Sequence, residues 1–126
     1  MLTAVQQLNY VIVLCDDLER MKAFYRDLFA FSIDSESDTT LAFRVGAILL
    51  SLRKRTRDYD GQGIRPELPG MQLAFLVSPA EVDQCYAQLL KKGVTILDPP
   101  TDQPRGHRTV YFADPEGNQL EIYAEI

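Results

Sequence analysis

The sequence predicts a single α+β domain, residues 1–126, built from two copies of a βαβββ module. First, two amphipathic segments with helical periodicity each follow a short apolar stretch that is typical of a strand. Second, further strand-like stretches follow each helical segment. Third, residues 10–33 align with residues 72–95. We therefore expect repeats over about residues 5–54 and 70–126, with both helices outside a curved mixed sheet that forms a cup.

The first repeat begins with residues 8–14, LNYVIVL, an apolar run typical of a buried strand. Asp16 or Asp17 can cap a helix that we expect to end near Phe29. The apolar stripe of this helix comprises Leu18, Met21, Tyr25, Leu28 and Phe29. Strands are then expected over residues 32–37, 39–45 and 47–52.

Residues 53–70, RKRTRDYDGQGIRPELPG, differ in character from the strands around them. They carry many charges, three glycines and two prolines, so we expect a long loop. Loops of this length are often binding lids, but many are plain surface connections. Both interpretations stay open.

The second repeat follows the same plan, starting with a strand over residues 71–77. Ser78 and Glu81 form a capping box, with Pro79 at the first helical position. Gly93 is expected to end the helix. The apolar stripe of this helix comprises Val82, Tyr86, Leu89 and Leu90. The remaining strands are expected over residues 94–97, 108–113 and 118–125.

The last two strands are joined by residues 114–117, Asp-Pro-Glu-Gly, whose residue types suit a tight turn. Alternation along the final strand places Leu120 and Ile122 on the core face. Glu121 then lies on the opposite face, beside Tyr123. If that face meets bulk water, Glu121 is an ordinary solvated carboxylate. If it lines a concavity, Glu121 is a candidate acid for contact with a ligand.

The internal alignment predicts four positions on the inner face of the cup. It places Tyr10 over Gln72, because the first strand of each repeat aligns with the other. It also places residues 46–50 over residues 117–121, and therefore Leu50 over Glu121. We expect these four side chains to converge, with Glu121 within reach of Tyr10 or Gln72.

Composition excludes some classes of partner. The net charge of −5 lacks the basic footprint of a nucleic-acid-binding protein. No apolar run approaches the length of a membrane span, and residues 1–10 lack the pattern of a secretory signal. We therefore expect a cytoplasmic protein, in which Cys15 and Cys85 are reduced thiols.

Three segments together resemble the vicinal oxygen chelate superfamily, which includes glyoxalase I, bleomycin resistance proteins and extradiol dioxygenases. They are DDLERMKAFYRDLFAF (residues 16–31), QLAFLVSPAEVDQCYAQLLKKGV (residues 72–94) and YFADPEGNQLEI (residues 111–122). The resemblance covers essentially the whole chain and implies the glyoxalase/bleomycin-resistance fold. One departure is Ala30, where the family usually has glycine.

The resemblance also identifies positions that bind metal in metal-dependent members of the superfamily, where they carry histidine or glutamate. Here these positions match Tyr10, Leu50, Gln72 and Glu121. Only Glu121 is a typical ligand, and a divalent ion in an enzyme site usually takes at least three protein donors. We therefore predict a member that has kept the cup and lost the metal, with no cofactor. A divalent metal ion is the alternative.

His107 is the only histidine and precedes the seventh expected strand. It is either an exposed loop residue or, if the loop folds over the cup, a ligand contact or a base. Arg44, Arg53 and Arg105 are possible charges at the rim of the cup, although solvation at the surface is the simpler explanation for each of them.

Three functions compete. The first is a small-molecule binder that holds an organic or cationic ligand, as in the drug-sequestering branch of the resembled superfamily. The second is a metal-dependent lyase, isomerase or dioxygenase with a rearranged site that uses Glu121 and His107. The third is a metal-free enzyme with Glu121 as base and Tyr10 as acid. The expected ligand contacts are Tyr10, Ile12, Phe43, Leu50, Gln72, His107, Tyr111, Glu121 and Tyr123.

We also expect a homodimer. Half-open sheets leave strand edges and apolar flanks that monomers rarely expose. Members of the resembled superfamily with chains of this length form dimers in which the cup is completed between modules.

Overall fold

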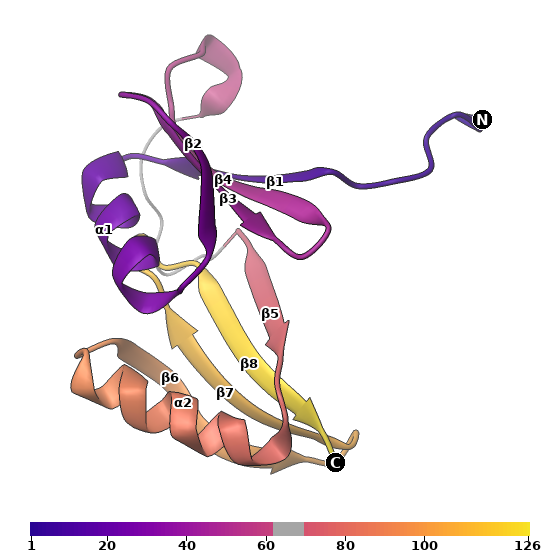
Figure 1. The fold of residues 1–126 in the computed structure, drawn as a ribbon, viewed down its shortest axis with the longest axis vertical. Helices are drawn as coiled ribbons and strands as arrows, with labels where there is room; N and C mark the ends of the chain where they lie inside the picture. Colours follow the sequence, from indigo (N-terminus) through magenta and orange to yellow (C-terminus); the bar gives the residue numbers. More distant parts are fainter. Residues whose placement is uncertain (62–69) are drawn as a thin grey trace. The chain divides into compact units, whose positions relative to one another are not determined.

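The computed structural model describes residues 1–61 and 70–126. The chain divides into two units, residues 1–63 and residues 64–126, which we call unit 1 and unit 2. Each unit contains one long helix and one four-stranded mixed sheet. Figure 1 labels these elements along the chain. This architecture confirms the predicted α+β fold of two βαβββ modules. The common cup stays a prediction.

Unit 1 has the strand order β1-β4-β3-β2, in which β1 runs parallel to β4 and the other neighbours are antiparallel. Its elements are β1 (Tyr10–Cys15), α1 (Leu18–Leu28), β2 (Ser32–Glu36), β3 (Thr40–Val45), β4 (Ile48–Lys54) and the short 3-10 helix η1 (Asp58–Asp60).

Unit 2 has the equivalent order β5-β8-β7-β6, with β5 parallel to β8. Its elements are β5 (Gln72–Leu76), α2 (Pro79–Lys91), β6 (Thr95–Gln103), β7 (His107–Ala113) and β8 (Gln119–Glu125). Strand β6 is longer than the sequence pattern indicated and continues through two prolines. Among the residues that the structure describes, no helix is long and apolar enough to cross a membrane.

The helix ends follow the residues that the sequence analysis identified. Asp17 caps α1, where its carboxylate accepts from the backbone N–H of Arg20 at 3.2 Å. Ser78 and Glu81 form the capping box of α2, in which the Ser78 N–H donates to Glu81 Oε1 at 3.0 Å. Gly93 follows α2 with φ +68°, a conformation that favours glycine. Both caps and the glycine stop are therefore confirmed.

Each unit has its own apolar core between helix and sheet. In unit 1, Met21 and Tyr25 of α1 are fully buried, together with Val13, Leu41 and Leu52 of the sheet. In unit 2, the buried residues are Val82 and Leu89 of α2 with Val110, Phe112 and Leu120 of the sheet. Leu90 was expected in the apolar stripe of α2 but is 53% exposed. It lies about 100° around the helix axis from Leu89 and so turns away from the sheet.

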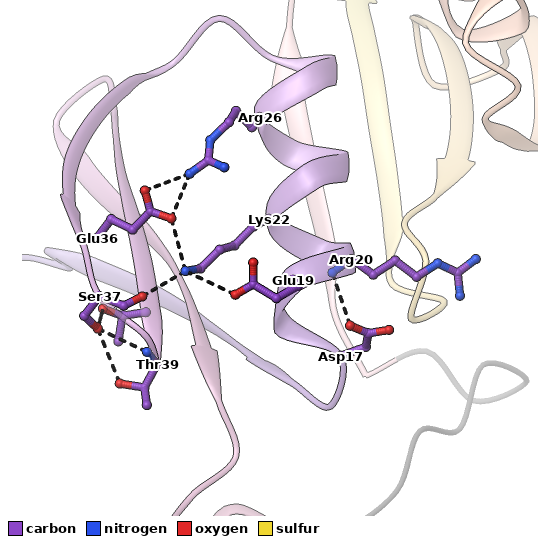
Figure 2. A network of polar contacts seen from close by, with 9 residues as sticks. Asp17, Glu19, Arg20, Lys22, Arg26, Glu36, Ser37 and Thr39 are labelled. Carbon is purple, nitrogen blue, oxygen red and sulfur yellow. Dashed lines mark hydrogen bonds and ion pairs between the residues drawn. The ribbon is translucent and has the colours of Figure 1, made fainter.

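A buried lysine links α1 to the end of β2, a feature that the sequence pattern did not predict (Figure 2). Lys22 is 4% exposed, and its Nζ donates to the carbonyl oxygen of Ser37 at 2.8 Å. The same Nζ lies 3.1 Å from Glu36 Oε2 and 3.6 Å from Glu19 Oε1. Arg26 also pairs with Glu36, at 2.8 Å. Because the lysine has several acceptors, its charge is compensated inside the unit.

The chain after β4 is closed by the carboxylate of Asp60. Arg53 donates to both Asp60 oxygens, at 3.0 and 2.8 Å, and the backbone N–H groups of Thr56 and Arg57 each donate to Oδ2 at 2.9 Å. The guanidinium of Arg53 holds the pKa of the Asp60 carboxyl well below its usual range. The first two residues of the expected loop, 53 and 54, belong instead to β4, and the residues that follow form a turn held by Asp60. Residues 62–69, which belong to the possible lid, lie outside the described residues.

Candidate functional site

Each sheet has one face covered by its helix and an opposite face, which we call the open face. In unit 2, Arg108 of β7 pairs with Asp83 of α2 at 2.8 Å and so lies on the helix side. Residues alternate along a strand, which places Tyr111 on the open face. Glu121 lies directly opposite Tyr111 across the β7–β8 pairing. Glu121 and Tyr111 are therefore neighbours on the open face, as alternation along the last strand predicted for Glu121.

Glu121 is held by the first strand of its own unit. It pairs with Ala74 of β5, so Gln72, two residues earlier, projects from the same face. Gln72 Nε2 donates to Glu121 Oε1 at 3.0 Å, and Glu121 is only 6% exposed. The prediction that Glu121 lies within reach of Gln72 is confirmed. Within the described part of the chain, no lysine, arginine or histidine forms an ion pair with this buried carboxylate.

Tyr111 is engaged by an arginine from the turn between β6 and β7. Arg105 Nη2 donates to the Tyr111 hydroxyl oxygen at 2.9 Å. The turn is compact, since the N–H of Gly106 donates to the carbonyl oxygen of Gln103 at 3.0 Å and Gly106 has φ +92°. Arg105 is exposed and has no carboxylate partner in residues 1–61 or 70–126. Sequence analysis identified it only as a possible rim charge, because a contact set by the turn has no sequence signal.

His107 and Tyr123 extend the open face of unit 2 away from Glu121. Their ring centroids are 4.9 Å apart with an interplanar angle of 36°. Thr109 lies directly opposite Tyr123 on the neighbouring strand, and its buried hydroxyl accepts from Gln103 Nε2 at 3.0 Å. His107 is therefore half-buried against an aromatic ring instead of lying free in a loop.

The separation between His107 and Glu121 limits what they can do together. His107 pairs with Glu125, four residues beyond Glu121 along β8. At about 3.4 Å per residue, their backbones are about 14 Å apart along the strand direction. This spacing disfavours a shared metal ion, which would need both side chains to bend towards each other.

Two of the expected contacts in unit 1 lie on its open face. Tyr10 pairs with Leu49 and is 49% exposed, and Ile12 is 46% exposed. Tyr10 and Gln72 are thus both on the face opposite the helix of their own unit, as predicted.

The prediction that Leu50 and Phe43 contact a ligand is wrong. Leu50 pairs with Val11 on one side and with Phe43 on the other, so these residues share the face opposite to Tyr10. Leu50 is 3% exposed and Phe43 is 1% exposed. The ring of Phe43 lies 6.0 Å from that of Phe31, which belongs to the aromatic cluster at the end of α1. Both residues belong to the core of unit 1, and neither can contact a ligand on the open face.

The alignment of Leu50 with Glu121 was wrong because the equivalent turns of the two units differ in length. Val45 pairs with Ile48, which leaves two residues in the turn of unit 1. In unit 2, the N–H of Asp114 donates to the carbonyl oxygen of Asn118 at 3.1 Å, which leaves three residues, 115–117. Aligning the glycines of the two turns therefore shifts the strands by one residue.

The strand pairings identify Ser51 as the equivalent of Glu121. Tyr10 pairs with Leu49, and Gln72 pairs with Gln119. Ser51 lies two residues after Leu49, just as Glu121 lies two residues after Gln119. Ser51 is 6% exposed, like Glu121.

The donor sets of the two units are poor for a metal ion. Unit 2 offers one carboxylate and one amide at the aligned positions, and unit 1 offers the hydroxyls of Tyr10 and Ser51. Across residues 1–61 and 70–126, no group of three or more His, Cys, Asp or Glu side chains is placed to hold a metal ion. These residues do not fit the divalent site of the metal-dependent members of the resembled superfamily.

A hollow of about 360 Å³ lies at the turn end of the open face of unit 2. Thr95, Ala113 and Gln119, which pair across neighbouring strands, form its floor, and residues of the 114–117 turn form its wall. The turn is fixed by Asp114, whose carboxylate accepts from the N–H groups of Glu116 and Asn118 at 2.9 and 3.0 Å. The open face of unit 2 thus has a concave end two residues from Glu121.

Comparison with known proteins gives a consistent family. Residues 7–122 match the family model described as the Glyoxalase/Bleomycin resistance protein/Dioxygenase superfamily. The chain is 30% identical over 119 residues to the metallothiol transferase FosB of Staphylococcus saprophyticus, covering 94% of this chain and 77% of that protein. It is 21% identical to the virulence protein STM3117 of Salmonella typhimurium, covering 94% of this chain and 83% of that protein.

Solved structures agree on the fold. A glyoxalase/bleomycin resistance protein/dioxygenase from Nocardioides superposes with a TM-score of 0.84 at 23% identity, covering 97% of this chain and 85% of that one. A lactoylglutathione lyase from Agrobacterium tumefaciens superposes with a TM-score of 0.75 at 22% identity, covering 95% and 94%.

Proposed function

Because the chain belongs to the glyoxalase/bleomycin resistance protein/dioxygenase superfamily, we propose that it binds a small organic molecule on the open face of unit 2. Glu121 is the principal polar contact, and binding needs no stoichiometric divalent metal. The fold is shared with enzymes and with binding proteins, so the argument for function comes from the site.

The observation that carries this proposal is the environment of Glu121. A carboxylate that is 6% exposed normally has a basic partner or a metal ion, because removing its charge from water is costly. Here the described residues provide only the amide of Gln72, at 3.0 Å. A ligand with a cationic or hydrogen-bond-donating group supplies the missing partner.

The surroundings of Glu121 suit an organic ligand. Tyr111 is its direct neighbour, and the rings of His107 and Tyr123 continue the same face. Aromatic surface with a few convergent polar groups is the usual composition of small-molecule sites. The hollow beside Gln119 gives room for part of such a molecule.

A metal-dependent transferase or lyase is the second candidate, and the observation in its favour is the similarity to FosB, which is named a metallothiol transferase. Against it stand the weak donor set at the aligned positions and the long separation of His107 from Glu121. Elemental analysis of the purified protein separates the two candidates. We expect far less than one equivalent of zinc, nickel, iron or manganese, and near-equimolar metal that is lost in Glu121→Gln would support the second candidate.

The binding test uses a screen of small organic amines and neutral donors, followed by calorimetry. Glu121→Gln keeps the shape of the side chain and removes its charge, so it should weaken a cationic hit by roughly 10- to 100-fold, the scale of a charge-assisted hydrogen bond. Glu125→Gln is the matched control, because Glu125 lies on the same strand and face but is exposed. Equal losses in the two variants would show that the hit senses only general surface charge and would refute the proposed site.

We also propose that the protein is a cytoplasmic homodimer. Sedimentation at micromolar concentration tests the assembly, and a monomeric mass would contradict it.

A further inference from the structure

The open face of unit 2 carries two opposite charges that do not pair with each other. The carboxylate of Glu121 accepts from Gln72, and the guanidinium of Arg105 donates to Tyr111. Both partners are neutral. Within residues 1–61 and 70–126, neither charge has an ion-pair partner, whereas Arg26, Arg44, Arg53 and Arg108 each pair with a carboxylate.

Tyr111 connects the two charges in space. It lies directly opposite Glu121 on the neighbouring strand, which places the Cβ atoms of the pair roughly 5 Å apart. Its hydroxyl oxygen accepts from Arg105, so the hydroxyl hydrogen is available to donate to a ligand. Arg105 uses one of its five N–H groups in this contact, and the others remain available to an anion.

From this arrangement we propose that the ligand is amphoteric. Its cationic or donor-bearing group contacts Glu121, and an anionic group of the carboxylate type contacts Arg105 and Tyr111. This inference rests on the proposed function, since it names the class of ligand for the same site. A ligand with a positive charge alone gains from Glu121 but is repelled by Arg105, whereas an amphoteric ligand complements both charges.

The separation of Glu121 from Arg105 also constrains the spacing of the charges in the ligand. Glu121 and Arg105 form no ion pair, and one tyrosine side chain lies between them. The two charged groups of the ligand are therefore separated by several bonds. An aromatic spacer also suits the ring surface that His107 and Tyr123 provide.

The test uses probes that differ only in charge. The amphoteric probes are 4-(aminomethyl)benzoate and its 3-isomer, and the single-charge probes are benzylamine and benzoate. We expect the better of the two isomers to bind at least tenfold more tightly than either single-charge probe in calorimetric or NMR titrations.

Variants then test which residues contact the anionic group of the probe and which contact its cationic group. Arg105→Gln and Tyr111→Phe should each remove most of the advantage of the amphoteric probe over benzylamine, with both probes measured on the same variant. Glu121→Gln should remove the advantage over benzoate. The controls are Arg20→Gln, an exposed arginine on α1 of unit 1, and Glu125→Gln on β8. Thermal unfolding of every variant verifies that it is folded.

The outcomes separate this inference from the proposed function. If benzylamine binding depends on Glu121 but the amphoteric probes bind no better, the proposed site stands and the amphoteric ligand is refuted. Another outcome is that the amphoteric probe binds more tightly than benzylamine in the wild type and also in both Arg105→Gln and Tyr111→Phe. Its anionic group then does not contact Arg105 and Tyr111, and the inference is also refuted. If no probe binds, this amphoteric class of ligand is refuted, while the amine screen with Glu121→Gln still decides the proposed function.

Discussion

Units 1 and 2 share one topology but carry different chemistry on their open faces. In unit 2 the aligned positions hold Gln72 and Glu121, which are joined by a hydrogen bond of 3.0 Å. In unit 1 they hold Tyr10 and Ser51, and no described hydrogen bond joins these two. The arginine of unit 1 that follows Ser51 on the open face, Arg53, is neutralised by Asp60. The comparison teaches that one module can carry different chemistry: Arg53 on the open face of unit 1 pairs with a carboxylate, whereas Glu121 and Arg105 of unit 2 contact neutral side chains among the described residues.

The units also differ in how the helix is joined to the sheet. In unit 1, the buried Lys22 bonds to the end of β2. In unit 2, Arg108 of β7 pairs with Asp83 and Asp102, all partly exposed, and these carboxylates raise the pKa of the arginine. Removing one partner of a buried charge costs more stability than removing one partner of an exposed pair, because it leaves uncompensated groups inside the protein.

The largest expected effect tests the corrected alignment of the two units. Leu50→Glu should destabilise the protein by about 4 kcal/mol or more, since it places an unpaired charge in the core of unit 1. Ser51→Glu should cost clearly less, because its equivalent in unit 2 is Glu121 on the open face. Chemical denaturation measures both.

If Leu50→Glu does not fold, Leu50→Ala and Ser51→Ala give the same comparison. The first should cost about 2–5 kcal/mol through lost packing, and the second should cost little. A larger loss for the serine variants would restore the alignment of Leu50 with Glu121.

The second prediction compares the charged contacts that join the helix to the sheet in the two units. Lys22→Met keeps the length of the side chain but leaves the carbonyl oxygen of Ser37 without its donor, so it should cost about 1–3 kcal/mol. Arg108→Met in unit 2 should cost less, because that arginine and its partners are partly exposed. Thermal and urea unfolding of both variants would test this order, which equal losses would contradict.

The third effect is local and depends on pH. The folded pKa of Asp60 lies below its ordinary value of 3.8, so its ionised form stabilises the turn at pH values above that. This contribution is lost as the pH falls below about 3.8 towards the lowered folded pKa. The protection factors of the Thr56 and Arg57 amides, which correct for the intrinsic pH dependence of exchange, should therefore fall in acid in the wild type.

Asp60→Asn should show lower protection factors at these amides already at neutral pH, with little further decrease in acid. Asp58→Asn, at an exposed position of the same 3-10 helix, is the control and should behave as the wild type does. Protection at Thr56 and Arg57 that does not change in Asp60→Asn would show that the carboxylate does not hold the turn.

The smallest effect concerns the stability of unit 2 when its site is altered. Glu121→Gln should change the free energy of unfolding by less than about 1 kcal/mol, since the new amide oxygen can still accept from Gln72. Urea unfolding measures this change. A loss of several kcal/mol would mean that Glu121 is a structural residue. This would contradict our proposal that the open face of unit 2 is a binding site.

The sequence alone determined the elements and the face on which Glu121 lies. Helix starts depend on a few adjacent residues, so Asp17 and the pair Ser78 and Glu81 could be identified as caps directly. Alternation along one strand is equally local, which is why the residue pattern suffices to place Glu121 opposite to Leu120 and Ile122. These rules act within a few residues and need no knowledge of distant parts of the chain.

Only the tertiary structure decided which residues meet across strands. One extra residue in the turn after β7 shifts the alignment of the repeats and replaces Leu50 by Ser51 as the equivalent of Glu121. The contact of Arg105 with Tyr111 depends on the fold of a separate turn. The physical reason is that pairing between strands is set by turn length and by packing over long sequence separations, and residue type records neither.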